Sequence, residues 1–259
     1  MARERTGAGD AAATLTLLWR QRPQSQRGPR PGLTVDAIVA AAIGIADAKG
    51  VEAVTMRAVA LALSAAPMAL YTHVPSKAEL LDLMLDSLFL GMSRAEPAGD
   101  GWRDRLAAIA RDNLALYSAH PWIASVATGR PPLGPGLMAK YEYELRGFDG
   151  LGLDEVETDA ALTFLLGFVE NCARIGGDAR ARAQADAMSD AGWWEANAPL
   201  LARVFDPARY PTATRVGAAA GAAHQGAYGV DHMFAFGLER VLDGIERLIE
   251  RRTQRAGDG

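Results

Sequence analysis

Apolar residues recur at intervals of three and four through most of the chain, which is the spacing of one face of an α-helix. Glycine and proline residues interrupt this pattern, and no stretch of any length alternates apolar and polar positions as a strand does. The pattern therefore predicts an all-α fold. The expected longer helices span residues 34–49, 77–92, 102–119, 136–148, 154–175 and 230–252, with shorter or more polar helices at 122–127 and 178–203.

Two short helices joined by a tight turn are predicted within residues 55–74. Thr55 is a suitable N-cap, and the apolar spacing of the first helix includes Val59. Residues 64–66 then break the pattern, and Pro67 suits the first turn of a second helix, where a helix leaves the N–H unpaired. Small and polar residues remain on the outer face of this second helix. This is the layout of a helix-turn-helix DNA-binding unit.

The next helix is predicted to be buried on nearly all sides. Ser76 and Glu79 form a capping box at its start, and apolar residues then occupy almost every face as far as Met92. Such a helix lies between layers, so we expect it to connect the DNA-binding unit to the rest of the chain. Lys77 has the unfavourable charge for a helix N-terminus, which favours a role at a DNA phosphate.

The segment Leu33–Leu90 resembles the DNA-binding domain of the tetracycline-repressor (TetR) family. The matching signature is Thr55-x-Arg57, then Leu70-Tyr71-x-His73-Val74, then Ser76-Lys77-x-x-Leu80-Leu81. Ser64 departs from the family pattern, which usually has glycine there, because serine adopts the required turn conformation only at some cost. The resemblance implies a three-helix domain at residues 33–77, with these DNA-binding residues: Thr55, Arg57, Pro67, Met68, Ala69, Tyr71, Thr72, His73 and Lys77.

The N-terminal arm, residues 1–32, is basic although the whole chain has a net charge of −4. Residues 1–33 hold six arginines and two acids, so the remainder of the chain is strongly acidic. We expect residues 1–14 to be a disordered tail and Leu15–Trp19 to form one apolar turn that docks on the protein. Two interpretations of Arg27 and Arg30 stay open: a flexible tail, or an arm that follows the DNA minor groove.

Residues 93–259 resemble, more weakly, the ligand-binding and dimerisation domain of the same family. Thr128–Pro131 is similar to the Arg-Pro loop beside the drug pocket, and the family's four-helix dimer bundle corresponds to residues 154–175 and 230–252. The helices at 102–119, 136–148 and 154–175 are expected to enclose a cavity. The candidate effector-binding residues are Trp102, Asn113, Tyr117, His120, Trp122, Arg130, Met138, Tyr141, Phe164, Phe168, Asn171 and Cys172.

Three details of this second domain are open to test. Asn171 interrupts an apolar helix face, where a buried amide would need hydrogen-bond partners. Gly176–Gly177 is expected to end the helix that begins near Asp154. Residues 206–229, with two prolines and a stretch rich in glycine and alanine, are predicted to form a mobile loop.

The sequence gives no support to a catalytic, metal or cofactor site. His120, His224 and His232 are scattered without the paired spacing of metal ligands, and no phosphate loop or nucleophile motif occurs. Val126 occupies the position where the tetracycline repressor has a magnesium-binding histidine, which argues against a magnesium–tetracycline ligand. A single cysteine, no long apolar run and no signal peptide favour a reducing cytoplasm and no membrane contact.

We therefore hypothesise a homodimeric repressor that leaves a palindromic operator on double-stranded DNA when a small apolar effector binds the second domain. Two alternatives remain open. One is an all-α enzyme or carrier that uses the same cavity. The other is a regulator without a small-molecule effector, which a filled core with no cavity above about 300 Å³ would favour.

Overall fold

The computed structural model describes residues 5–21, 33–94, 97, 99–126, 130–185, 189–224 and 229–257, and within them the predicted all-α fold is confirmed. None of the helices in these ranges is long and apolar enough to cross a membrane. The helices are α1 (Ala11–Leu18), α2 (Val35–Lys49), α3 (Met56–Ala62), α4 (Pro67–Tyr71), α5 (Lys77–Leu90), α6 (Trp102–Ala119), α7 (Pro135–Arg146), α8 (Glu155–Ala185), α9 (Asp190–Val204), α10 (Pro211–His224) and α11 (Val230–Gly257), with 3₁₀ helices η1 (Val51–Ala53) and η2 (Pro121–Ser125).

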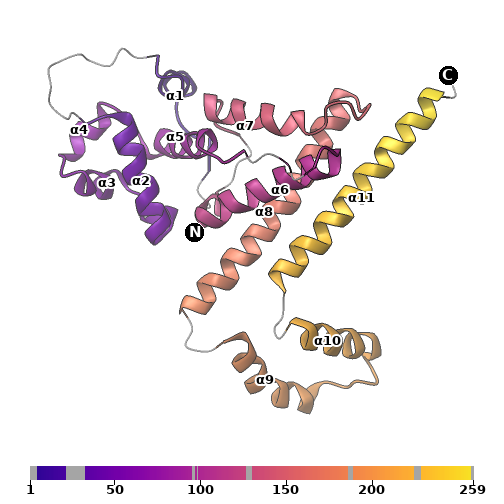
Figure 1. The fold of residues 1–259 in the computed structure, drawn as a ribbon. Coiled ribbons are helices and arrows are strands. Elements are labelled where there is room, and N and C mark those ends of the chain that lie inside the picture. Colours follow the sequence, from indigo (N-terminus) through magenta and orange to yellow (C-terminus); the bar gives the residue numbers. More distant parts are fainter. Residues whose placement is uncertain are drawn as a thin grey trace.

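Helices α2, α3 and α4 pack around one small core at one end of the molecule (Figure 1). Ile38, Val59 and Leu70, one from each helix, are completely buried there. Thr55 caps α3 by accepting a hydrogen bond from the amide of Ala58 at 3.0 Å. Ser64 takes a φ of +51°, so the turn between α3 and α4 has the left-handed conformation that usually requires glycine.

Helix α5 is the central element of the molecule, with α1, α2 and α7 all packed against it (Figure 1). Three acidic residues on α5 are buried, and each accepts a backbone N–H from a residue outside α5. Glu79 accepts from Asp10, Asp82 from Gly7 and Asp86 from Leu137. These bonds tie α5 to the N-terminal arm on one side and to the start of α7 on the other.

The N-terminal arm is more ordered than the sequence predicts. Instead of a disordered tail through residue 14, the chain forms α1, and Leu17 and Leu18 of this helix are buried against α5. The Trp19 indole N–H donates to the carbonyl of Leu133 at 2.9 Å, so the arm also reaches the loop before α7. Burial of two leucines outweighs the loss of chain entropy that favoured a tail. Arg27 and Arg30 lie outside the described residues.

Asp82 makes the stability of this arm contact dependent on pH. Burial is the main cause that raises the pKa of its carboxyl from 3.8 to about 6. The folded state therefore binds more protons than the unfolded state between these values, and the free energy of unfolding falls as the pH rises through this window. We expect Asp82→Asn, which keeps an oxygen for the Gly7 amide, to stabilise the protein by about 2 kcal/mol at pH 7.

Urea unfolding of the wild type and Asp82→Asn at several pH values checks this prediction. The difference in unfolding free energy should shrink toward zero as the pH falls to 4. A constant difference across that range would mean that Asp82 does not titrate between the folded and unfolded states as its burial requires.

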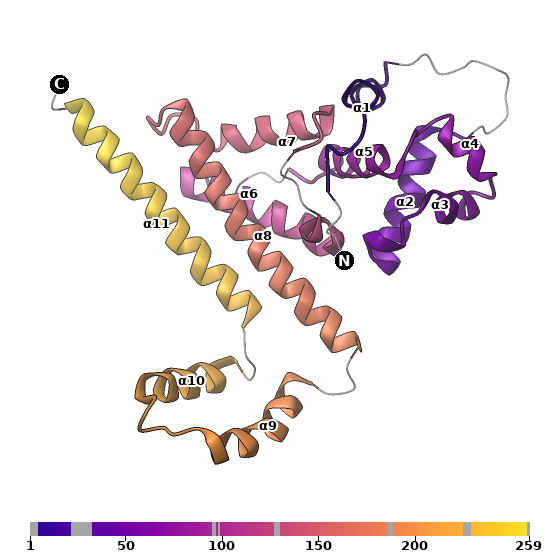
Figure 2. The ribbon, with the colours of Figure 1, turned by 180° about the vertical axis from the view of Figure 1, so that it is seen from behind.

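The second half of the chain is built on a long pair of helices, α8 and α11, which run side by side along the body (Figures 1 and 2). Leu165 of α8, Leu242 of α11 and Leu106 of α6 are buried together in its core. Helices α9 and α10 form the connection between α8 and α11 and lie at one end of this helix pair (Figure 2).

Two predictions about this region were wrong. Helix α8 does not end at Gly176–Gly177 but continues to Ala185, because a glycine inside a helix costs only about 1 kcal/mol and Gly176 is buried. Residues 211–224 form α10 rather than part of a mobile loop. Pro211 stands at the first helical position, where proline is favoured, and the alanines that follow are strong helix formers.

Candidate DNA-binding surface and effector cavity

The outer face of the helix-turn-helix presents small and mostly apolar side chains. Met68 is 74% exposed and Tyr71 is 44% exposed, while Leu70 between them is completely buried and holds α4 in place. Thr72 is also exposed, and its hydroxyl donates to the carbonyl of Ala69. Such a surface suits contact with thymine methyl groups in a major groove more than hydrogen bonding to bases.

The other predicted DNA-binding residues surround this face. Arg57 and Pro67 are exposed, and Ala69 and His73 are half-buried. Lys77 is also half-buried, and its ammonium donates to the carbonyl of Val51 at 3.4 Å. Lys77 therefore connects the start of α5 to the start of η1, besides any contact it makes with a phosphate.

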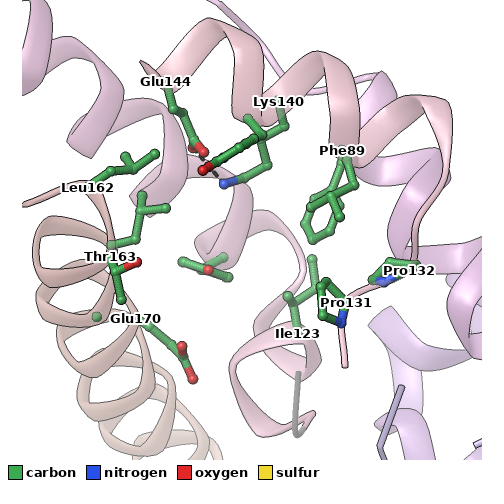
Figure 3. A pocket seen from close by; sticks show the side chains of 14 residues that line it. Phe89, Ile123, Pro131, Pro132, Lys140, Glu144, Leu162, Thr163 and Glu170 are labelled. Carbon is green, nitrogen blue, oxygen red and sulfur yellow. Dashed lines mark hydrogen bonds and ion pairs between the residues drawn. The ribbon is translucent and has the colours of Figure 1, made fainter. Parts of the chain in front are cut away.

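A cavity of about 390 Å³ lies among α5, α6, η2, α7 and α8. This is the group of helices from which the sequence predicts a cavity, with α5 and η2 added. Its walls are mainly apolar, and their side chains converge on one space in Figure 3. The lining residues are Phe89, Tyr117, Ile123, Pro131, Pro132, Leu137, Lys140, Tyr141, Glu144, Leu162, Thr163, Leu166, Gly167 and Glu170.

A buried ion pair lies at one end of the cavity, where Lys140 and Glu144 meet on α7 (Figure 3). The Lys140 Nζ lies 2.5 Å from Oε1 of Glu144, and both side chains are almost fully buried. The same carboxylate oxygen accepts the amide N–H of Asn113 from α6 at 2.7 Å. Burial, with the nearby charges of Glu170 and Glu144, raises the pKa of Tyr117, so its hydroxyl stays protonated.

Of the candidate effector-binding residues, Tyr117 and Tyr141 line the cavity. Asn113 lies one layer behind, bonded to Glu144. Arg130 is exposed and belongs to a separate cavity of about 430 Å³ beneath the N-terminal arm. The remaining candidates do not line the main cavity: Trp102, His120, Trp122, Met138, Phe164, Phe168, Asn171 and Cys172.

Several predicted effector-binding residues do not line the cavity because they lie on another face of the helix that carries them. Asn171 is exposed and accepts a hydrogen bond from Arg174, so the expected buried amide is not this residue but Asn113. Phe168 faces α11 instead of the cavity and stacks on Phe234, with ring centroids 5.9 Å apart. Met138 and Phe164 are exposed and Cys172 is buried away from the lining, because each lies on another face of its helix.

His120 and Trp122 connect the two halves of the molecule. His120 Nδ1 lies 2.8 Å from Oδ1 of Asp47 on α2, and the indole N–H of Trp122 donates to the same oxygen at 2.8 Å. Ile123, the next residue of η2, lines the cavity. The segment that supplies Ile123 to the cavity wall is therefore hydrogen-bonded directly to α2 of the DNA-binding domain.

Lys140 and Glu144 are the functional candidates that the sequence analysis missed. Their spacing of four residues is that of an ordinary solvent-exposed helix pair, and nothing in the pattern of α7 distinguishes a buried pair from an exposed one.

In the described part of the chain, no three histidine, cysteine, aspartate or glutamate side chains come together as a metal site would require.

Comparison with known proteins agrees with both halves of this arrangement. Residues 38–84 match the model of bacterial regulatory proteins of the tetR family, and residues 95–249 match that of the tetracyclin repressor-like C-terminal domain. The chain is 40% identical over 251 residues to the HTH-type transcriptional repressor DrrR1 of Streptomyces coeruleorubidus, which covers 96% of this chain and 90% of that protein.

Solved structures that resemble this chain also include TetR family proteins. The TetR family protein ActR of Streptomyces coelicolor in complex with actinorhodin has a TM-score of 0.69 and 27% identity, with 83% of this chain and 96% of ActR covered. Its complex with (S)-DNPA has a TM-score of 0.67 and 26% identity, covering 84% and 99%. The chain belongs to the tetR family. It is a DNA-binding transcriptional repressor and not an enzyme.

Proposed function

We propose that this repressor binds a palindromic operator as a homodimer and leaves it when a small, largely apolar molecule occupies the 390 Å³ cavity. The observation that carries the proposal is that α5 takes part in both sites. Phe89 at the end of α5 lines the cavity, and the start of the same helix packs on the DNA-binding domain. The cavity also exceeds the size of about 300 Å³ below which an effector-free regulator would be favoured.

Movement of the cavity wall reaches the DNA-binding domain through α5. The carboxylate of Asp86, one turn before Phe89, accepts the amide of Leu137 at 2.8 Å near the start of α7. A ligand that displaces α7 or Phe89 therefore shifts α5, while the contacts of His120 and Trp122 with Asp47 act on α2 directly. A coupling of about 1–3 kcal/mol between ligand and DNA binding is enough for regulation.

Homodimerisation is proposed through α8 and α11. Val156 and Phe164 of α8 are 80% and 64% exposed, and Phe236 of α11 is 56% exposed, which is unusual for large apolar side chains on a surface. Burial between two copies accounts for them. In such a dimer the two α4 helices would enter successive major grooves about 34–36 Å apart.

ActR, which resembles this chain, was crystallised with actinorhodin and with (S)-DNPA. We take this as support for a small-molecule effector here as well. We also propose a cytoplasmic location, because the operator DNA of a bacterial regulator lies there.

Selection of bound fragments from genomic DNA, repeated over a range of salt concentrations, tests the proposal. One enriched palindromic site with a steep loss of affinity at higher salt is expected of a specific dimeric repressor. Binding without enrichment of any site would contradict it.

Tyr71→Ala is expected to weaken binding to the selected operator about tenfold. Tyr71 is exposed at the end of α4, so the substitution removes a DNA contact while leaving the buried Leu70 in place. Fluorescence anisotropy with labelled operator measures the change. Tyr210→Ala is the matched control, because Tyr210 is equally exposed but lies beside α10, far along the chain from the helix-turn-helix. Equal affinity of both variants would exclude Tyr71 from the interface.

A further inference from the structure

Lys140 has more hydrogen-bond donors than the protein uses. Its side chain is only 7% exposed, and its ammonium makes one hydrogen bond, to Oε1 of Glu144. The ring of Phe89, with its centroid 5.6 Å from Nζ, is the other group that faces it. An ammonium has three N–H donors, so two have no oxygen acceptor among the described residues.

The unused donors lie where a ligand would be. Lys140, Glu144 and Phe89 all line the cavity, and the ammonium faces its interior in Figure 3. Elsewhere in this cluster, Oδ1 of Asn113 is buried without a partner in the described part of the chain. A buried charged pair is favourable only when its remaining donors and acceptors are satisfied, so this pair is incomplete until something supplies an acceptor.

The charge of the pair restricts what that acceptor is. Glu144 balances the positive charge of Lys140 at 2.5 Å, and Glu170 adds a carboxylate to another wall of the cavity. An anionic ligand would bring a further negative charge close to both glutamates. A neutral carbonyl oxygen accepts the same N–H donors without that repulsion, and the apolar walls suit the ring system that carries it.

We propose that Lys140 binds a neutral carbonyl oxygen of the effector, so that the cavity selects ketone- or quinone-bearing ring compounds over hydrocarbons and carboxylates of the same shape. This inference rests on the proposed function of the cavity as the effector site. It assigns to Lys140 the part of selection that the apolar walls cannot provide, because they bind any ring of suitable size.

Three tricyclic probes of similar size test the proposal in direct binding measurements: 9-acetylanthracene, 9-ethylanthracene and anthracene-9-carboxylate. The first offers a neutral carbonyl, the second offers no acceptor, and the third is an anion. We expect the full-length protein to bind the ketone about tenfold more tightly than the hydrocarbon, because a hydrogen bond to a charged donor is worth about 1.5 kcal/mol or more. The carboxylate is expected to bind more weakly than the ketone.

Lys140→Met keeps the length and apolar stem of the side chain but removes its donors. It should abolish the tenfold preference for the ketone over 9-ethylanthracene. Because this variant leaves Glu144 buried without its cation, K140M/E144Q is measured as well; its glutamine still accepts the amide of Asn113. Lys49→Met, at an exposed lysine near the end of α2, is the control and should bind all three probes like the wild type.

The possible failures are distinguishable. Equal binding of ketone and hydrocarbon, or an equal loss of both in the Lys140 variants, would overturn the role of Lys140 while leaving the cavity as a binding site. Tightest binding of the carboxylate would show that Lys140 selects an anion, which also overturns the proposal. No binding of any probe would count against the cavity as the effector site and therefore against both proposals.

Discussion

Replacing Gly136 with alanine is expected to destabilise the protein by about 3 kcal/mol. A Cβ at this position would lie 1.9 Å from the carbonyl oxygen of Asp86 and 2.9 Å from the amide nitrogen of Leu90. Both atoms belong to the backbone of α5, so no side-chain rotation relieves the overlap. Helices α5 and α7 would have to separate along the contact that joins the DNA-binding domain to the cavity.

Thermal unfolding followed by circular dichroism measures this effect. A loss of about 3 kcal/mol corresponds to a fall in Tm of roughly 10 °C for a protein of this size. Gly44→Ala is the matched control, because Gly44 lies within α2 and a Cβ there would have no neighbour within 4 Å. That variant should be slightly more stable than the wild type, since alanine is the better helix former. Equal Tm values for Gly136→Ala and the wild type would show that α5 and α7 do not pack this closely.

The sequence predicted the DNA-binding domain in more detail than the cavity, because the interactions that define this domain join residues close together in the sequence. Capping residues such as Thr55, the proline at the start of α4 and the buried spacing of Leu70 and Val74 all act within a few residues of each other. The structure even places Ser64 in the left-handed conformation that its position in the motif requires. Short-range rules are sufficient where a domain is built from short-range contacts.

The cavity depends on contacts between distant segments, and there the sequence predicted the surrounding helices but few of the lining side chains. Asn113 and Asn171 are both amides within mainly apolar helices, yet only packing against α7 decides that the first is buried and the second is not. The same holds for α1. Its few leucines were enough to predict a docked apolar turn at Leu15–Trp19 but too short a pattern to predict the full helix, which depends on the surface that α5 offers.

Glu144→Ala is expected to be among the most damaging single substitutions in the second domain, with a loss of about 3–5 kcal/mol. Glu144 is 1% exposed, and its Oε1 accepts hydrogen bonds from both Lys140 and Asn113. Removing the carboxylate leaves a buried ammonium without a counter-ion, and the Asn113 amide keeps only its hydrogen bond to the carbonyl of Ile109. Breaking one member of a buried ion pair typically costs this much.

Urea unfolding of Glu144→Ala, Glu144→Gln and K140M/E144Q separates charge from hydrogen bonding. Glu144→Gln should lose less than alanine, because its amide oxygen still accepts from Asn113. K140M/E144Q should be more stable than Glu144→Ala, since it leaves no charge at the site of the buried pair. A loss below about 1 kcal/mol in Glu144→Ala would mean that water reaches Lys140 in place of the carboxylate.

The order of these variants also bears on why the pair exists. A buried ion pair is often no more stabilising than well-packed apolar residues of the same volume. If the neutral double variant is as stable as the wild type, folding does not require Lys140 and Glu144. Their place in the wall of the cavity is then explained by the ligand: Glu144 holds the Lys140 ammonium at a fixed point, and the two remaining donors are available to the effector.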